Sequence, residues 1–96
     1  MSFVKEELLG RSIRVNGKVQ GVYFRQSAKE KSIELGINGW VRNEEDGSVY
    51  MEVCGNLESL DKLTEWVKDG PQQAQVTSVV TEDIQFIEFH NFMIRE

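Results

Sequence analysis

The stretch RSIRVNGKVQGVYFRQSAKEKSIELG, residues 11–36, changes its hydrophobic period part-way along. Apolar and polar residues alternate over Arg11–Val19, which is typical of a half-buried strand. From Phe24 onward the small and apolar residues recur every three or four positions, as they do on one face of a helix. Gly36 follows where a helix would end. The stretch therefore predicts a strand, a turn and then a helix that begins near Phe24.

The rest of the chain adds a hairpin, a second helix and two more strands. Alternation returns over Ile37–Asn43 and Val49–Cys54, and an Asp-Gly pair between them marks a hairpin turn. Two further strands are expected at Val76–Glu82 and Phe89–Ile94. The second helix is expected to have its N-cap at Asn56 and to end at Gly70-Pro71. It is expected to place Trp66 in the core or at its margin and to bury Leu57, Leu60, Leu63 and Val67.

This order of elements is β-α-β-β-α-β followed by one short terminal strand. It predicts an α+β, ferredoxin-like sandwich, in which a mainly antiparallel sheet carries two helices on one face. The terminal strand is expected either at the edge of the sheet or as a continuation of the strand before it.

Length, charge and composition restrict the classes of protein to consider. A chain of 96 residues with 40% hydrophobic and 28% charged residues is expected to form one domain over residues 1–96, with residues 1–10 as a loosely ordered extension. A net charge of −5 disfavours binding to nucleic acid or to an anionic membrane. Residues 1–10 lack the apolar run of a signal peptide, so a cytoplasmic protein is expected. The chain is also expected to be a monomer.

The segment NGKVQGVYFR, residues 16–25, joins the first strand to the first helix. Its glycines, Gly17 and Gly21, allow a tight turn whose amides point inward and form a nest for an anion. Arg25 at the start of the helix adds a planar fork of donors that suits phosphate. The alternative is a tight turn beside a solvated arginine.

A second segment, LGINGWVRN at residues 35–43, ends its strand at Asn43. An asparagine amide both donates and accepts hydrogen bonds, so Asn43 is suited to orienting a water molecule. The alternative is that Asn43 only shapes the hairpin.

Three segments together resemble the acylphosphatase family: Gly17–Arg25 (GKVQGVYFR), Leu35–Asn43 (LGINGWVRN) and Asp46–Val49 (DGSV). Gly70-Pro71, Val76, Val79 and Phe92-x-Ile94 extend the likeness over nearly the whole chain from about Ser12. One departure is Ser32, which stands where alanine is usual. The resemblance implies a ferredoxin-like scaffold and metal-independent hydrolysis of the carboxyl–phosphate bond of acyl phosphates, without a cofactor.

The resemblance also implies roles for individual residues. Arg25 matches the arginine that binds phosphate, and Asn43 matches the asparagine that positions water. The loop whose amides surround the phosphate corresponds to Lys18, Val19, Gln20, Gly21, Val22, Tyr23 and Phe24. The expected ligands are a small acyl phosphate and, as an inhibiting product, inorganic phosphate.

Other reactive residues have simpler interpretations. With one cysteine and one histidine, the chain has neither an internal disulfide nor an evident transition-metal site. Cys54 is interpreted as a packing residue, and His90 as a strand residue without a catalytic task. The acidic run Glu44-Glu45-Asp46 fits a solvated hairpin tip better than a cation site.

Two rival functions follow from the same order of elements. An RNA-binding module would use aromatic residues on the open sheet face, where alternation places Trp40 and Tyr50 beside Arg14 and Arg42. The third strand lacks the basic-glycine-aromatic pattern of such modules, and the negative charge of Glu52 disfavours RNA binding. A non-catalytic domain that binds phosphate or handles carbamoyl phosphate is the nearer alternative.

Overall fold

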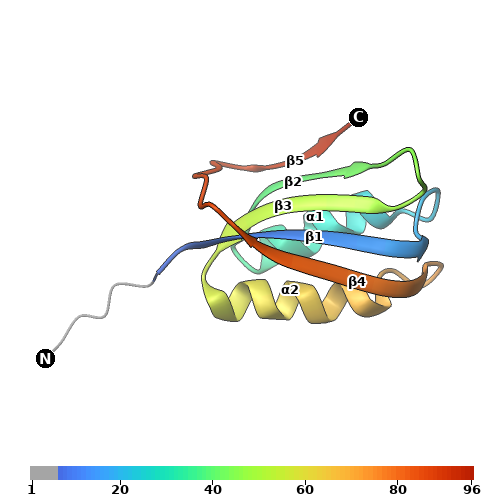
Figure 1. Cartoon of the computed structure of the whole chain (residues 1–96), viewed down its shortest axis with the longest axis horizontal. Helices are drawn as coiled ribbons and strands as arrows, with labels where there is room; N and C mark the ends of the chain where they lie inside the picture. Colours follow the sequence, from blue (N-terminus) through green and yellow to red (C-terminus); the bar gives the residue numbers. More distant parts are fainter. Residues whose placement is uncertain (1–6) are drawn as a thin grey trace, which may run out of the picture.

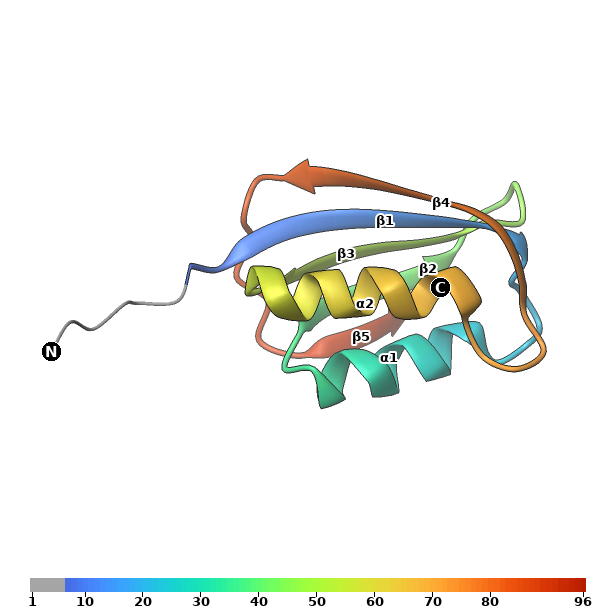
Figure 2. The ribbon, with the colours of Figure 1, turned by 90° about the horizontal axis from the view of Figure 1, so that it is seen from below.

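The computed structural model describes residues 7–96, and the five strands in this range form one sheet (Figure 1). The strands are β1 (Leu9–Lys18), β2 (Asn38–Asn43), β3 (Val49–Gly55), β4 (Gln75–Ile84) and β5 (Phe92–Arg95). The helices are α1 (Phe24–Glu34) and α2 (Leu57–Asp69). Both helices cover the same face of the sheet (Figure 2). The ferredoxin-like arrangement expected from the sequence is therefore confirmed.

The strand order across the sheet is β4-β1-β3-β2-β5. Neighbouring strands are antiparallel except β2 and β5, which are parallel. The terminal strand is thus a separate edge strand and not a continuation of β4. It begins at Phe92, because the chain must first cross from one edge of the sheet to the other (Figure 1). The expected strand Phe89–Ile94 is therefore too long at its start, and His90 lies outside it.

The first helix has the boundaries that the sequence predicts. α1 buries Phe24, Ala28 and Ser32 against the sheet. The chain leaves the helix through Gly36, whose φ of 73° lies in the left-handed region that glycine tolerates. The Gly36 N–H donates to the Ile33 carbonyl at 3.1 Å and so satisfies one carbonyl of the last turn.

The second helix follows the prediction except at its first residue. The Asn56 side chain accepts a hydrogen bond from Ser59 N–H at 2.8 Å, as an N-cap should. Leu60, Leu63 and Val67 are fully buried, but Leu57 is 51% exposed. The expected burial of Leu57 is wrong: this residue is the first of the helix, one turn before the buried stripe of Leu60, Leu63 and Val67 begins.

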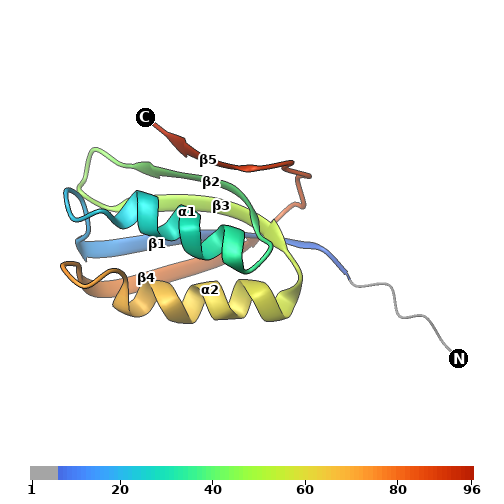
Figure 3. The ribbon, with the colours of Figure 1, turned by 180° about the vertical axis from the view of Figure 1, so that it is seen from behind.

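The core lies between the sheet and the two helices. The sheet contributes, among others, Ile13, Val15, Val41, Met51 and Val53. Phe24 and Trp66 join the helices, with ring centroids 5.8 Å apart, which places Trp66 at the core margin as expected. The β1–α1 loop, the β2–β3 hairpin and the C-terminus all lie at one end of this sandwich (Figure 3). The packing of the core therefore brings three distant segments of sequence together.

The N-terminal extension expected at residues 1–10 falls mostly outside the described residues, which begin at residue 7. Leu9 and Gly10 form the start of β1, where they pair with Gly55 and Cys54 of β3.

Candidate active site

The loop between β1 and α1, residues 19–23, has an unusual backbone. Gly21 and Tyr23 have φ angles of 73° and 66°, both in the left-handed region. A Cβ added at Gly21 would meet no atom within 4 Å, so the glycine is needed for its backbone conformation alone. For a tyrosine this conformation costs on the order of 1 kcal/mol, and such strain often occurs at functional sites. The Tyr23 side chain is 78% exposed and gains nothing from burial there.

This backbone leaves a series of amide groups without protein partners. Within the described residues, no hydrogen bond in the loops or caps is donated by an N–H of residues 20–26, and the first such donor is Ser27, which bonds the Tyr23 carbonyl at 3.0 Å. Helix α1 also begins without a side-chain cap. Unpaired N–H groups and the positive end of the helix dipole together favour an anion at this position.

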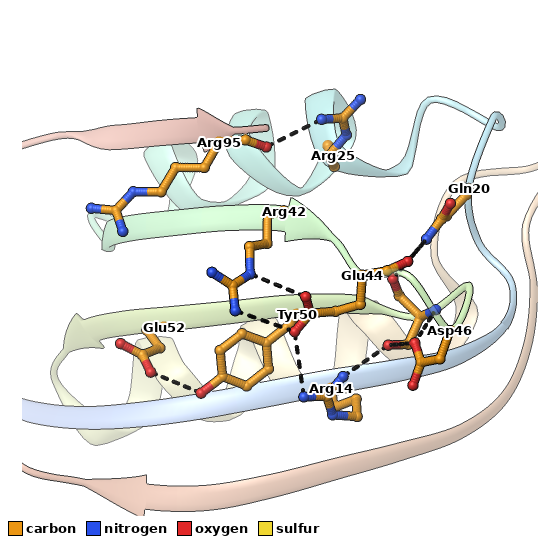
Figure 4. Close-up of polar contacts among 10 residues, drawn as sticks. Arg14, Gln20, Arg25, Arg42, Glu44, Asp46, Tyr50, Glu52 and Arg95 are labelled. Atoms are coloured by element: carbon orange, nitrogen blue, oxygen red, sulfur yellow. Dashed lines mark hydrogen bonds and ion pairs between the residues drawn. The ribbon is translucent and has the colours of Figure 1, made fainter.

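Arg25 lies in the first turn of α1, beside these amides. Its Nη1 donates to the Arg95 carbonyl at 3.3 Å, which ties the guanidinium to the C-terminal strand β5 (Figure 4). The guanidinium has five N–H donors, so this one contact leaves several for a ligand. Asn43 is the last residue of β2 and is half-buried. None of the side-chain hydrogen bonds in the described part of the chain uses the Asn43 amide.

These groups surround a hollow of about 230 Å³. Six residues that the sequence singled out line it: Val19, Gly21, Tyr23, Phe24, Arg25 and Asn43. Gln26 and Ile94 also line the hollow but were not expected there. Gln26 directly follows Arg25, so its place at the hollow could have been predicted from that of Arg25. Ile94 comes from β5, and no short-range pattern connects it with the loop.

The other expected loop residues lie outside the hollow. Lys18 is the exposed last residue of β1, and Val22 is buried in the core. The Gln20 side chain points toward the β2–β3 hairpin (Figure 4). Gly17 is not part of the anion nest, because it lies in β1, where an added Cβ would come within 2.1 Å of the Gln75 carbonyl oxygen. Gly17 instead permits the close approach of β1 and β4.

The β2–β3 hairpin is held by its own polar side chains. Asp46 Oδ1 accepts hydrogen bonds from the Ser48 hydroxyl at 2.6 Å and from Ser48 N–H at 2.9 Å. These bonds lower the pKa of Asp46 below its usual value of 3.8. The Glu44 carboxylate pairs with Arg42 at 3.2 Å and with Arg14 at 3.5 Å. Thus Glu44 and Asp46 of the acidic run help to hold the turn, whereas Glu45 is exposed.

The open face of the sheet carries aromatic rings stacked with arginines. Trp40 and Tyr50 lie with ring centroids 5.6 Å apart. The guanidinium carbons of Arg95 and Arg42 lie 4.5 and 5.1 Å from the Trp40 ring, and Arg14 lies 4.8 Å from the Tyr50 ring. Trp40 is only 6% exposed. The rings are therefore where the sequence placed them, but guanidinium groups occupy the surfaces that RNA bases would need.

Two further residues, Tyr50 and Cys54, are described by their burial and hydrogen bonding. Burial, together with the hydrogen bond of 2.8 Å that Tyr50 donates to Glu52, raises the pKa of the Tyr50 phenol above 10.0. Cys54 is buried near the end of β3, consistent with a packing role.

Residues 7–96 contain no group of three or more His, Cys, Asp or Glu side chains arranged to hold a metal ion. No helix in the described part of the chain is long and apolar enough to span a membrane.

Comparison with known proteins places this chain in a family. The family model named Acylphosphatase matches residues 11–94. The chain belongs to the acylphosphatase family. A curated acylphosphatase of Coxiella burnetii (strain RSA 493 / Nine Mile phase I) is 43% identical over 83 residues, which cover 86% of this chain and 87% of the relative.

Solved structures agree with this assignment. A structure of an acylphosphatase from Coxiella burnetii superposes with a TM-score of 0.89 at 41% identity and covers 92% of this chain and 93% of that one. The crystal structure of acylphosphatase from Bacillus subtilis superposes with a TM-score of 0.88 at 32% identity. The match covers 94% of this chain and 100% of that one. Family membership makes this chain a hydrolase of the acylphosphatase type.

Proposed function

We propose that this acylphosphatase-family chain cleaves the carboxyl–phosphate bond of a small acyl phosphate at the hollow between α1, β2 and β5. The observation that carries the proposal is the row of unpaired amides at residues 20–26, next to Arg25 and opposite the free amide of Asn43. The amides and Arg25 supply the donors that a dianionic phosphoryl group requires. Asn43 faces the same space and supplies an amide that can hold a water molecule.

The chemistry assigned to these groups is direct transfer of the phosphoryl group to water. The loop amides and Arg25 bind the phosphoryl oxygens and stabilise the charge that develops on them. Asn43 holds a water in line with the bond that breaks. The water oxygen bonds to phosphorus, the bond from phosphorus to the acyl oxygen breaks, and its electron pair leaves on the carboxylate.

The proton of the attacking water also needs an acceptor. In the described part of the chain, the residues that line the hollow include no Asp, Glu, His or Cys that would act as a general base. The proposal therefore gives the proton to an oxygen of the substrate's own phosphoryl group, so that the products are a carboxylate and inorganic phosphate. Metal independence, product inhibition by phosphate, a monomeric state and a cytoplasmic location complete the proposal.

Benzoyl phosphate is a direct test, because its hydrolysis changes its ultraviolet absorbance. The purified chain should hydrolyse it with saturation kinetics, and inorganic phosphate should inhibit competitively. The non-catalytic alternative predicts a different pair of results, namely phosphate binding by calorimetry without any hydrolysis above the spontaneous rate. That outcome would contradict the proposed function.

A further inference from the structure

Gln20 is the one residue of the β1–α1 loop whose side chain bonds to the β2–β3 hairpin in the described structure. Its Nε2 donates to the Glu44 carbonyl at 2.8 Å and to the Ser48 carbonyl at 3.0 Å (Figure 4). The side chain is half-buried, and a primary amide has two hydrogens on this nitrogen. Both donors of Gln20 are therefore used to connect the loop to the hairpin.

The hairpin end that receives these bonds is itself firmly held. Glu44 N–H donates to the Ser48 carbonyl at 2.8 Å, and Gly47 N–H donates to the Glu44 carbonyl at 3.1 Å. The Glu44 carboxylate is held from the other side by Arg14 and Arg42. Glu44 directly follows Asn43, so Gln20 attaches the anion-binding loop to the residue next to the proposed water-binding amide.

We propose that the Gln20 side chain is a positioning residue, which sets the distance between the loop amides and Asn43. The inference rests on the proposed function, in which the loop holds the phosphoryl group and Asn43 holds the attacking water. The separation of the loop and Asn43 then becomes the separation of phosphorus and water. A displacement of about 1 Å between reacting groups lowers rates on the order of 10²-fold.

The local hydrogen bonding separates this role from a purely structural one. Each carbonyl that Gln20 contacts also accepts a backbone N–H of the hairpin. Truncation of Gln20 therefore leaves neither carbonyl without a partner, and the hairpin keeps its own bonds. The loop remains fixed at its ends by β1 and α1. Gln20→Ala is therefore expected to fold, but with the β1–α1 loop displaced from its position in the parent chain.

The test compares Gln20→Ala and Gln20→Glu with the parent chain. Glutamate preserves the length of the side chain, but an ionised carboxylate has no hydrogen to donate and repels both carbonyls. With benzoyl phosphate, kcat should fall about 10- to 100-fold in both variants. The inhibition constant of inorganic phosphate should change less than about threefold, because the amides that bind it remain. Gln73→Ala and Gln73→Glu, at an exposed loop position between α2 and β4, should match the parent chain.

A double-mutant cycle with Asn43→Ala then identifies the partner. If Gln20 acts by placing the loop relative to Asn43, Gln20→Ala should cost little once Asn43 is already alanine. Additive losses in kcat would overturn the inference, as would a loss of phosphate affinity at unchanged kcat. Circular dichroism and thermal unfolding confirm that each variant is folded at the assay temperature.

The outcomes also separate this inference from the proposed function. An active parent chain whose folded Gln20 variants keep the parental kcat would overturn the positioning role alone. An inactive parent chain would overturn the proposed function, and the positioning role with it.

Discussion

Among residues 7–96, Arg25 is the only cationic side chain that lines the hollow. Arg25→Ala should lower kcat/KM for benzoyl phosphate on the order of 10³-fold, because donors aimed at a developing phosphoryl charge contribute this much. It should also weaken inhibition by inorganic phosphate. Arg25→Lys should fail as well, since an ammonium group offers a point charge where a planar fork is needed. The measurements are steady-state kinetics and calorimetric phosphate binding.

The location of Arg25 allows its variants to be checked for general damage to the fold. Its one side-chain hydrogen bond within residues 7–96, of 3.3 Å to the Arg95 carbonyl, lies at the edge of the sheet and not in the core. Folding of Arg25→Ala should therefore be close to that of the parent chain. Near-normal turnover by this variant would be incompatible with the anion site proposed here.

Variants of Asn43 distinguish an effect on the chemical step from an effect on phosphate binding. If the loop and Arg25 hold the phosphoryl group, Asn43 acts only on the water, and its interaction matters as the bond to phosphorus forms. Asn43→Ala should retain phosphate affinity close to that of the parent chain and lose about 10²–10³-fold in kcat. Calorimetry and steady-state kinetics on the same preparations measure both quantities.

Two further results at Asn43 decide between its possible roles. Asn43→Asp should be no better than the alanine variant, because its charge repels the phosphoryl dianion and the N–H donor is lost. If Asn43→Ala loses phosphate affinity at unchanged kcat, Asn43 is a ligand of the phosphate. If neither quantity changes, it is only a turn residue.

The individual site residues differ in how far the sequence could predict them. The spacing of Gly21, Arg25 and Asn43 matched a family pattern, and the fold brings these residues to one hollow. The hairpin contact of the Gln20 side chain could not be foreseen, because its partners lie more than twenty positions away. The same holds for Ile94, which reaches the hollow only through the parallel pairing of β5 with β2.

At the scale of elements, α1 carries an unfavourable residue in its buried face. The Ser32 hydroxyl is buried and has no hydrogen-bond partner among residues 7–96. Ser32→Ala should raise the free energy of unfolding by about 1 kcal/mol, since it removes an unsatisfied polar group and improves helix propensity. For a domain of this size that corresponds to an increase of about 4–8 °C in Tm.

Thermal and denaturant unfolding measure this change. Ser27→Ala, at a half-buried position of the same helix, is the matched control and should give a smaller gain, from helix propensity alone. Destabilisation by Ser32→Ala would show that the hydroxyl packs better than a methyl group in the space between α1 and the sheet. The kinetics should not change in either variant.

Element type was easier to predict from the sequence than element boundaries. Periodicity and caps located both helices, because Asn56 and Gly36 have local physical reasons to begin or end them. The region after β4 carried no such signal. Its conformation depends on the crossing from one sheet edge to the other, and the contact of Asn38 Nδ2 with the Phe89 carbonyl at 2.9 Å belongs to that tertiary path.

At the scale of the whole molecule, the site for an anion lies on an acidic protein. The net charge of −5 repels polyanions at long range, whereas in the proposed site the amides and Arg25 would attract a small anion over a few ångströms. This combination favours a small phosphorylated substrate over a nucleic acid. On the open sheet face, guanidinium groups lie over the aromatic rings on which RNA bases would stack.

The composition of the whole chain also leads to the last prediction, that activity needs no metal ion. The chain has a single histidine and a single cysteine, and the cysteine is buried. In the proposed mechanism the charge on the phosphoryl group is balanced by Arg25 and the loop amides, which do not depend on a divalent ion. Prolonged dialysis against EDTA should leave kcat and KM for benzoyl phosphate unchanged, and added Mg²⁺ should not raise them. Elemental analysis of the active protein should find well below one metal ion per chain. A loss of activity that only a divalent ion restores would mean that the amides and Arg25 are insufficient, and the mechanism would need a metal-bound phosphate.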